Sequence, residues 1–88
     1  MKILTIGRSN ADIILKDQDS QISRLHAELT ASDKKTFYLV DCGSSNGTFV
    51  KRDGAWKEIR QDFVTESDEV RFGKKYSTTV RDLLRQTR

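Results

Sequence analysis

The chain has 88 residues, which suffices for one small domain with a thin hydrophobic core but not for a second domain. Its 16 basic and 13 acidic residues are mixed along the chain, and the net charge of +3 favours anionic partners only mildly. One cysteine excludes an internal disulfide, and a single histidine excludes a zinc site of the usual kind. Because no apolar stretch approaches about twenty residues, we expect one cytoplasmic domain over residues 1–88, without a signal peptide or a membrane contact.

Short apolar runs bounded by glycines, with no proline anywhere, make up most of the chain. Several of these runs alternate with a period of two and are rich in β-branched and aromatic residues, as strands are. We expect strands at residues 2–6, 12–15, 26–30, 37–42, 48–51, 55–59, 69–72 and 78–83. Strands this short and this closely spaced predict an antiparallel β-sandwich or barrel.

One turn is well defined by the sequence, and one terminal segment is not. Asp53-Gly54 separates two apolar runs and tolerates positive φ, so it predicts a tight hairpin turn. In residues 79–88, Val80, Leu83 and Leu84 have helical spacing. This segment therefore fits a last strand, a helical turn or a linker.

Enzymatic chemistry finds little support in the sequence. Catalysis usually needs a nucleophile, a base and an orienting group together, and His26 is the only residue that ordinarily serves as a base at neutral pH. Ser23 stands three residues before His26, and either Asp17 or Asp41 could complete a trio, but such trios arise often by chance. No serine has the nucleophile-elbow pattern around it. We expect a binding domain rather than an enzyme, with no catalytic residue, no cofactor and no metal.

Three loop-like segments are rich in groups that bind oxyanions. They are residues 7–10 (Gly-Arg-Ser-Asn), 20–24 (Ser-Gln-Ile-Ser-Arg) and 43–48 (Gly-Ser-Ser-Asn-Gly-Thr). Arginine supplies a planar fork of donors for phosphate, hydroxyl groups add short donors, and glycines let backbone N–H groups face a ligand. Each segment alone also fits an ordinary turn. If the three meet at one end of a sandwich, they form a small anion pocket.

The order and spacing of these segments resemble the forkhead-associated (FHA) family. The likeness covers Gly7-Arg8, Asp12-Ile13, residues 22–27 (Ile-Ser-Arg-Leu-His-Ala), residues 40–50 (Val-Asp-Cys-Gly-Ser-Ser-Asn-Gly-Thr-Phe-Val) and residues 68–73 (Asp-Glu-Val-Arg-Phe-Gly). It implies an all-β antiparallel sandwich of about eleven short strands, whose loops at one end bind phosphothreonine peptides. Ser67 departs from the family's usual glycine, which predicts a strained backbone there.

The resemblance also implies which residues would recognise the ligand. Arg8 corresponds to the arginine that grips the phosphate, and Ser23 to the serine that donates a hydroxyl hydrogen bond to it. Ser45 and Arg24 occupy positions that often add contacts near the phosphothreonine. Asn46 corresponds to the asparagine that holds the peptide backbone, a task that suits a side chain with both a donor and an acceptor.

Four further residues match positions that support the site in the family. Gly7 would admit a tight chain path, and His26 would brace the recognition loops from beneath. Gly47 and Thr48 would complete and anchor the turn that presents the asparagine. These roles, like those of the recognition residues, come from the resemblance.

The function predicted in this way is phosphothreonine-dependent recruitment of protein partners in Ser/Thr kinase signalling. The alternative is a phosphorylation-independent assembly domain of a larger complex, in which the loops or a sandwich face bind the partner. A nucleic-acid-binding barrel needs a basic face with exposed aromatic side chains. Trp56, Tyr38 and Tyr76 fit apolar packing better than base stacking, so nucleic acid is the least favoured partner.

Overall fold

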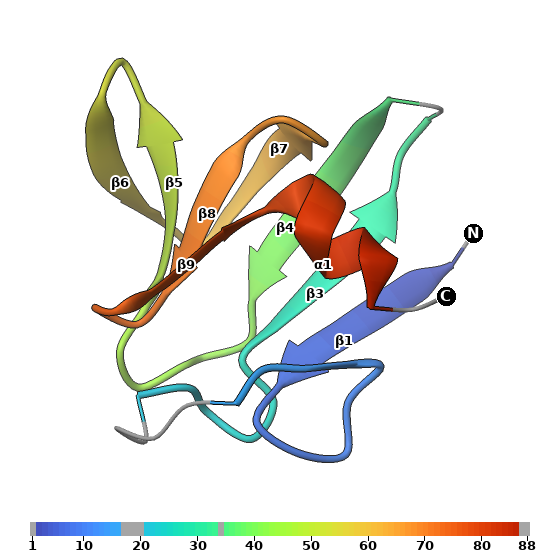
Figure 1. The fold of residues 1–88 in the computed structure, drawn as a ribbon, viewed down its shortest axis with the longest axis vertical. Helices are drawn as coiled ribbons and strands as arrows, with labels where there is room; N and C mark the ends of the chain where they lie inside the picture. Colours follow the sequence, from blue (N-terminus) through green and yellow to red (C-terminus); the bar gives the residue numbers. More distant parts are fainter. Residues whose placement is uncertain (1, 17–20, 34, 87–88) are drawn as a thin grey trace.

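The computed structural model describes residues 2–16, 21–33 and 35–86, and these residues form nine strands and one helix. The elements are β1 (Ile3–Gly7), β2 (Ile13–Ile14), β3 (Ala27–Ala31), β4 (Thr36–Asp41), β5 (Thr48–Arg52), β6 (Ala55–Ile59), β7 (Gln61–Thr65), β8 (Glu69–Phe72), β9 (Tyr76–Thr79) and α1 (Val80–Arg85). The strands form two sheets, in the orders β2-β1-β3-β4-β7 and β6-β5-β8-β9 (Figure 1). The all-β sandwich is confirmed.

The strand number is lower than the resemblance implies, because the described residues form nine strands rather than eleven. β2 pairs with β1 over two residues only, and the segments around these two strands make single hydrogen bonds to other loops and to strand ends. The Arg8 N–H donates to the Ser23 carbonyl at 3.1 Å, and the His26 N–H donates to the Ile6 carbonyl at 2.8 Å. These segments therefore stay irregular, and they are the ones that carry candidate site residues.

The core lies between the two sheets and is built from alternating strand positions. The buried apolar side chains are Leu4, Ile6, Ile13, Leu15, Ile22, Ala27, Leu29, Leu39, Val50, Ile59, Val64, Val70, Phe72, Val80 and Leu83. Among the described residues, two polar side chains, His26 and Thr48, are buried with them. Because buried polar groups need partners, these two residues point to a hydrogen-bonded network under the loops.

The outer face of the larger sheet carries an aromatic pair. Tyr38 on β4 and Phe63 on β7 stand opposite each other, with ring centroids 4.9 Å apart, and Phe63 is 55% exposed. Together with Thr30 they border a hollow of about 320 Å³. We refer to this surface as the Tyr38–Phe63 face.

The backbone at the predicted hairpin turn behaves as expected, whereas Ser67 does not. Asp53 and Gly54 have φ values of 53° and 79°, as the tight turn between β5 and β6 requires. Within the described residues, Asn10 and Asp53 are the non-glycine residues with positive φ. Ser67 is not among them, so the prediction of strain at Ser67 is wrong: the β7–β8 turn does not need the left-handed conformation that favours glycine.

The last part of the chain forms a helix rather than the strand expected at residues 78–83. β9 ends at Thr79, whose hydroxyl accepts a hydrogen bond from the Asp82 N–H at 3.2 Å and so caps α1. The helix buries Val80 and Leu83 in the core, in agreement with their helical spacing.

No helix in the described part of the chain is long and apolar enough to span a membrane.

Candidate functional site

The described residues of the three segments predicted to bind an oxyanion meet at one end of the sandwich, at the bottom of the view in Figure 1. The Arg8 N–H donates to the Ser23 carbonyl at 3.1 Å, and the Ser45 N–H donates to the Ser23 hydroxyl oxygen at 3.2 Å. The Asn46 side-chain amide donates to the Gln21 carbonyl at 3.0 Å. The fold thus gathers Arg8, Ser23, Ser45 and Asn46 from three separate loops.

Gly7 allows the first of these loops to approach the second. A Cβ atom on Gly7 would lie 1.9 Å from the Arg24 carbonyl oxygen and 2.8 Å from its carbon, well inside the 3.0 Å that real Cβ atoms respect. Any side chain would therefore push the two loops apart. The absence of a Cβ is what lets Arg8, the next residue, lie beside Ser23.

His26 is fully buried and ties two of the loops together through its ring nitrogens. The Ser23 N–H donates to Nδ1 at 3.1 Å, and Nε2 lies 2.8 Å from the Gly47 carbonyl oxygen. Because Nδ1 accepts a hydrogen bond, we assign the proton to Nε2, which donates to Gly47. The ring also packs edge-on against Phe72, with centroids 5.4 Å apart. Both nitrogens are engaged inside the core, so neither is available as a general base.

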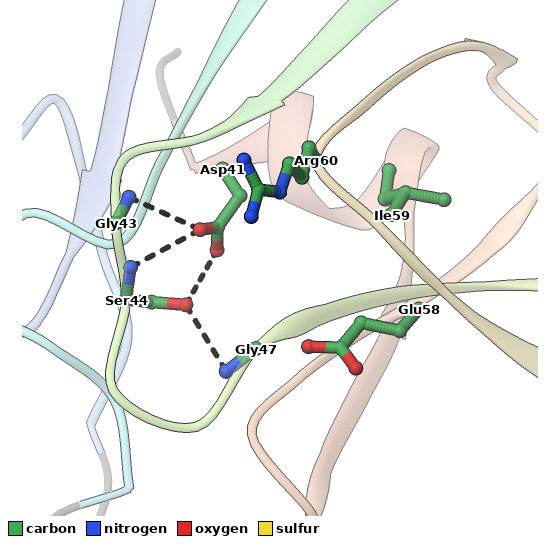
Figure 2. A pocket seen from close by; sticks show the side chains of 7 residues that line it. All are labelled: Asp41, Gly43, Ser44, Gly47, Glu58, Ile59 and Arg60. Carbon is green, nitrogen blue, oxygen red and sulfur yellow. Dashed lines mark hydrogen bonds between the residues drawn. The ribbon is translucent and has the colours of Figure 1, made fainter.

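Asp41, the last residue of β4, holds the 43–48 loop in shape (Figure 2). Its Oδ2 accepts the N–H groups of Gly43 and Ser44, and its Oδ1 accepts the hydroxyls of Ser44 and Thr48. The Ser44 hydroxyl oxygen accepts the Gly47 N–H in turn at 3.1 Å. Partial burial raises the pKa of Asp41, but the hydrogen bonds from Ser44 and Thr48 outweigh it, so this pKa lies below its ordinary value.

A hollow of about 650 Å³ lies beside the same loop. It is lined by Asp41, Gly43, Ser44, Gly47, Glu58, Ile59 and Arg60 (Figure 2). A phosphate in this hollow would meet the guanidinium of Arg60 but also the carboxylates of Asp41 and Glu58, and neither Arg8 nor Ser23 lines the hollow. The hollow is therefore a poor phosphate site, and the exposed loop surface around Arg8 suits an anion better.

The side chains that could meet a ligand on this surface have free donors. Arg8, Arg24 and Ser45 are exposed, and Ser23 and Asn46 are half-buried. Within the described residues, the guanidinium of Arg8 has no hydrogen bond or ion pair. The Ser23 oxygen accepts from a backbone N–H and keeps its own O–H to donate. The described residues hold no cluster of three or more His, Cys, Asp or Glu that suits a metal ion.

Two contributors to the site are not predicted by the sequence analysis. Asp41 stands two residues before Gly43-Ser44, and an aspartate at such a turn often accepts hydrogen bonds from the N–H groups that follow it. The local sequence is therefore sufficient to predict this role of Asp41. Gln21 anchors Asn46 through its carbonyl and accepts the Lys74 N–H on its side-chain oxygen at 2.7 Å. Because Lys74 lies 53 positions away, no local pattern reveals this contact.

The sequence matches the model of a known protein family. The model of the FHA domain matches residues 4–73. The chain belongs to the FHA domain family. The oxoglutarate dehydrogenase inhibitor of Corynebacterium diphtheriae is 40% identical over 70 residues, which are 80% of this chain and 45% of that protein. This FHA chain thus spans about half the length of that relative.

Solved FHA structures share the fold. The FHA domain of the CT664 protein from Chlamydia trachomatis has 29% identity and a TM-score of 0.69, covering 82% of this chain and 69% of that one. Mycobacterium tuberculosis EmbR, in complex with a low-affinity phosphopeptide, has 26% identity and a TM-score of 0.70, and the match covers 88% of this chain and 19% of that one. The FhaA FHA domain, complexed with the intracellular domain of Rv3910, has 30% identity and a TM-score of 0.63, and the match covers 81% of this chain and 71% of that one.

Proposed function

We propose that this FHA domain is a phosphothreonine-dependent interaction module that recruits phosphorylated proteins in Ser/Thr kinase signalling. The observation that carries the proposal is the backbone hydrogen bond from the Arg8 N–H to the Ser23 carbonyl, which joins the two loops. It brings Arg8, whose guanidinium has no partner among the described residues, next to Ser23, whose hydroxyl keeps its O–H to donate. The complexes of EmbR with a phosphopeptide and of FhaA with an intracellular domain support the proposal.

Each recognition residue has a role that follows from its chemistry. Arg8 offers two parallel N–H donors to the phosphate, and the Ser23 hydroxyl adds a third donor. Exposed Arg24 and Ser45 lie on the same loops and supply further donors to the phosphopeptide. Asn46 donates one side-chain amide N–H to the Gln21 carbonyl. Its other amide N–H and its side-chain oxygen remain available to a peptide backbone.

The domain proposed here binds its partner without catalysing a reaction on it, and it acts in the cytoplasm. His26 has both nitrogens engaged, which leaves it a scaffolding role. The free thiol of Cys42 fits a reducing compartment, and partial burial raises its pKa, which disfavours the nucleophilic thiolate.

Binding to paired peptides tests the proposal. A library-selected phosphothreonine peptide and its unphosphorylated counterpart are titrated against the wild type, Arg8→Ala, Ser23→Ala and Arg81→Ala. Loss of a charge-assisted contact at Arg8 or Ser23 should weaken phosphopeptide binding by about tenfold or more. Arg81, which lies on α1 away from the loops, is the control for loss of positive charge.

Two results would overturn the proposal. If Arg8→Ala binds the phosphopeptide as tightly as the wild type does, the pocket is wrongly placed. If the unphosphorylated peptide binds as tightly as the phosphorylated one, the domain is a phosphorylation-independent assembly module instead.

A further inference from the structure

The outer face of the smaller sheet begins at the recognition loop and combines aromatic rings with cations. Thr48 at the start of β5 points into the core, so Phe49 and Lys51 are the neighbours that alternate outward. Across the strands, Phe49 stands opposite Arg71 on β8, and Lys51 stands opposite Trp56 on β6. Rings and cations therefore lie side by side on one surface, where all four side chains are half-buried.

Arg71 is fixed in one orientation on this face. Its Cζ lies 4.2 Å from the centroid of the Phe49 ring and 5.0 Å from that of the Trp56 ring, and its Nε donates to the Gly73 carbonyl at 3.0 Å. Within the described residues its two terminal nitrogens have no hydrogen-bond or carboxylate partner, whereas Lys51 is paired with a glutamate. Ring stacking occupies the flat faces of a guanidinium and leaves its edge available. Arg71 thus presents an oriented pair of donors.

This surface is continuous with the proposed phosphopeptide site. The Gly73 N–H donates to the Gly47 carbonyl at 2.9 Å. A Cβ on Gly47 would lie 3.1 Å from the Phe49 ring, and Asn46 directly precedes Gly47. A peptide held by Asn46 therefore passes onto Phe49 and Arg71 when it extends towards the smaller sheet.

We infer that Arg71 recognises an acidic side chain in the partner segment that flanks the phosphothreonine, an inference that rests on the proposed function. A carboxylate matches the fork of a guanidinium through two parallel hydrogen bonds. The face as a whole is not strongly basic, because Lys51 is paired with Glu69 at 3.8 Å and Glu58 lies across Phe49 from Arg71. Selectivity for the carboxylate therefore depends on the placing of one guanidinium rather than on a general positive charge.

A peptide array tests this inference. Each peptide carries one phosphothreonine, and each flanking position holds either aspartate or alanine in turn. The wild type is compared with Arg71→Gln, which removes the charge, and with Arg71→Lys, which keeps the charge but loses the planar fork. Lys57→Gln is the matched control, because Lys57 follows Trp56 on β6 and alternates to the opposite side of the strand.

The wild type should prefer aspartate over alanine by about fivefold at one flanking position or more. Arg71→Gln should bring this ratio to about one, Arg71→Lys should give an intermediate ratio, and Lys57→Gln should keep the wild-type ratio. A merely structural role of Arg71 would lower the affinity for both peptides equally and leave the ratio unchanged.

The inference is overturned if the wild type shows no aspartate preference, if Arg71→Gln keeps it, or if Lys57→Gln abolishes it equally. Failure of the proposed function looks different, because the wild type would then bind no phosphopeptide better than its unphosphorylated counterpart. If Arg8→Ala abolishes binding while Arg71→Gln keeps the aspartate ratio, the inference about Arg71 alone is wrong.

Discussion

Replacement of His26 by phenylalanine tests whether the buried imidazole holds the recognition loops together. Phenylalanine keeps an aromatic ring against Phe72, but it cannot accept the Ser23 N–H or donate to the Gly47 carbonyl. The Gly47 carbonyl retains the hydrogen bond from the Gly73 N–H. Since leaving a buried polar group without its partner costs about 1–3 kcal/mol, we expect a loss of about 2–4 kcal/mol. A chain of this length has roughly 4–13 kcal/mol of stability in total.

Urea unfolding, followed by the fluorescence of Trp56, measures this loss. With a slope of about 2 kcal/mol per molar urea, the midpoint for His26→Phe should fall by about 1–2 M at an unchanged slope. The folded variant should also bind phosphopeptide more weakly, because Ser23 is no longer held. Tyr38→Phe is the control, because Tyr38 lies on the outer face of the larger sheet. It should alter the free energy of unfolding by less than about 0.5 kcal/mol. If His26→Phe shows no larger change than this control, with wild-type phosphopeptide affinity, the bracing role is refuted.

Three further changes probe the support of the site. Gly7→Ala places a Cβ 1.9 Å from the Arg24 carbonyl oxygen, so circular dichroism should show loss of folding; wild-type stability and affinity would contradict the required close approach. Thr48→Val keeps the buried volume but removes the hydroxyl bound to Asp41, and urea unfolding should register a loss of about 1.5–3 kcal/mol, whereas no loss would exclude a stabilising bond. Because the folded pKa of Asp41 lies below its ordinary 3.8, its contribution is complete above that pH and is lost as the pH falls through the folded value. Asp41→Asn should therefore flatten this part of the pH–stability curve, and an unchanged curve would assign the acid sensitivity to other groups.

The sandwich and the order of its loops could be predicted because short sequence patterns indicate most of the strands and turns. Period-two alternation marks most of the strands, and the Asp53-Gly54 pair fixes its own turn through two positive φ values. β7 is not predicted, because it buries only Val64, while Phe63 faces outward and the remaining positions are polar. At the C-terminal end, Thr78 and Thr79 are β-branched and suggest a longer strand, yet the Thr79 hydroxyl caps a helix instead.

The site itself depends on contacts that no local pattern contains. The resemblance indicates Arg8, Ser23 and Asn46 individually, but only the fold shows that Ser45 binds the Ser23 hydroxyl oxygen from 22 positions away. The same holds for the Asn46 amide, which is anchored on Gln21 over 25 positions. Loops held by such long-range hydrogen bonds acquire their shape only when both sheets have assembled.

Amide chemical shifts of isotope-labelled protein, titrated with a phosphothreonine peptide and its unphosphorylated counterpart, locate the binding surface most directly. The largest changes should fall on Arg8, Ser23 and Asn46, and they should be absent with the unphosphorylated peptide. Equal changes with both peptides, or changes centred on the Tyr38–Phe63 face, would contradict a phosphothreonine pocket at the loop end of the sandwich.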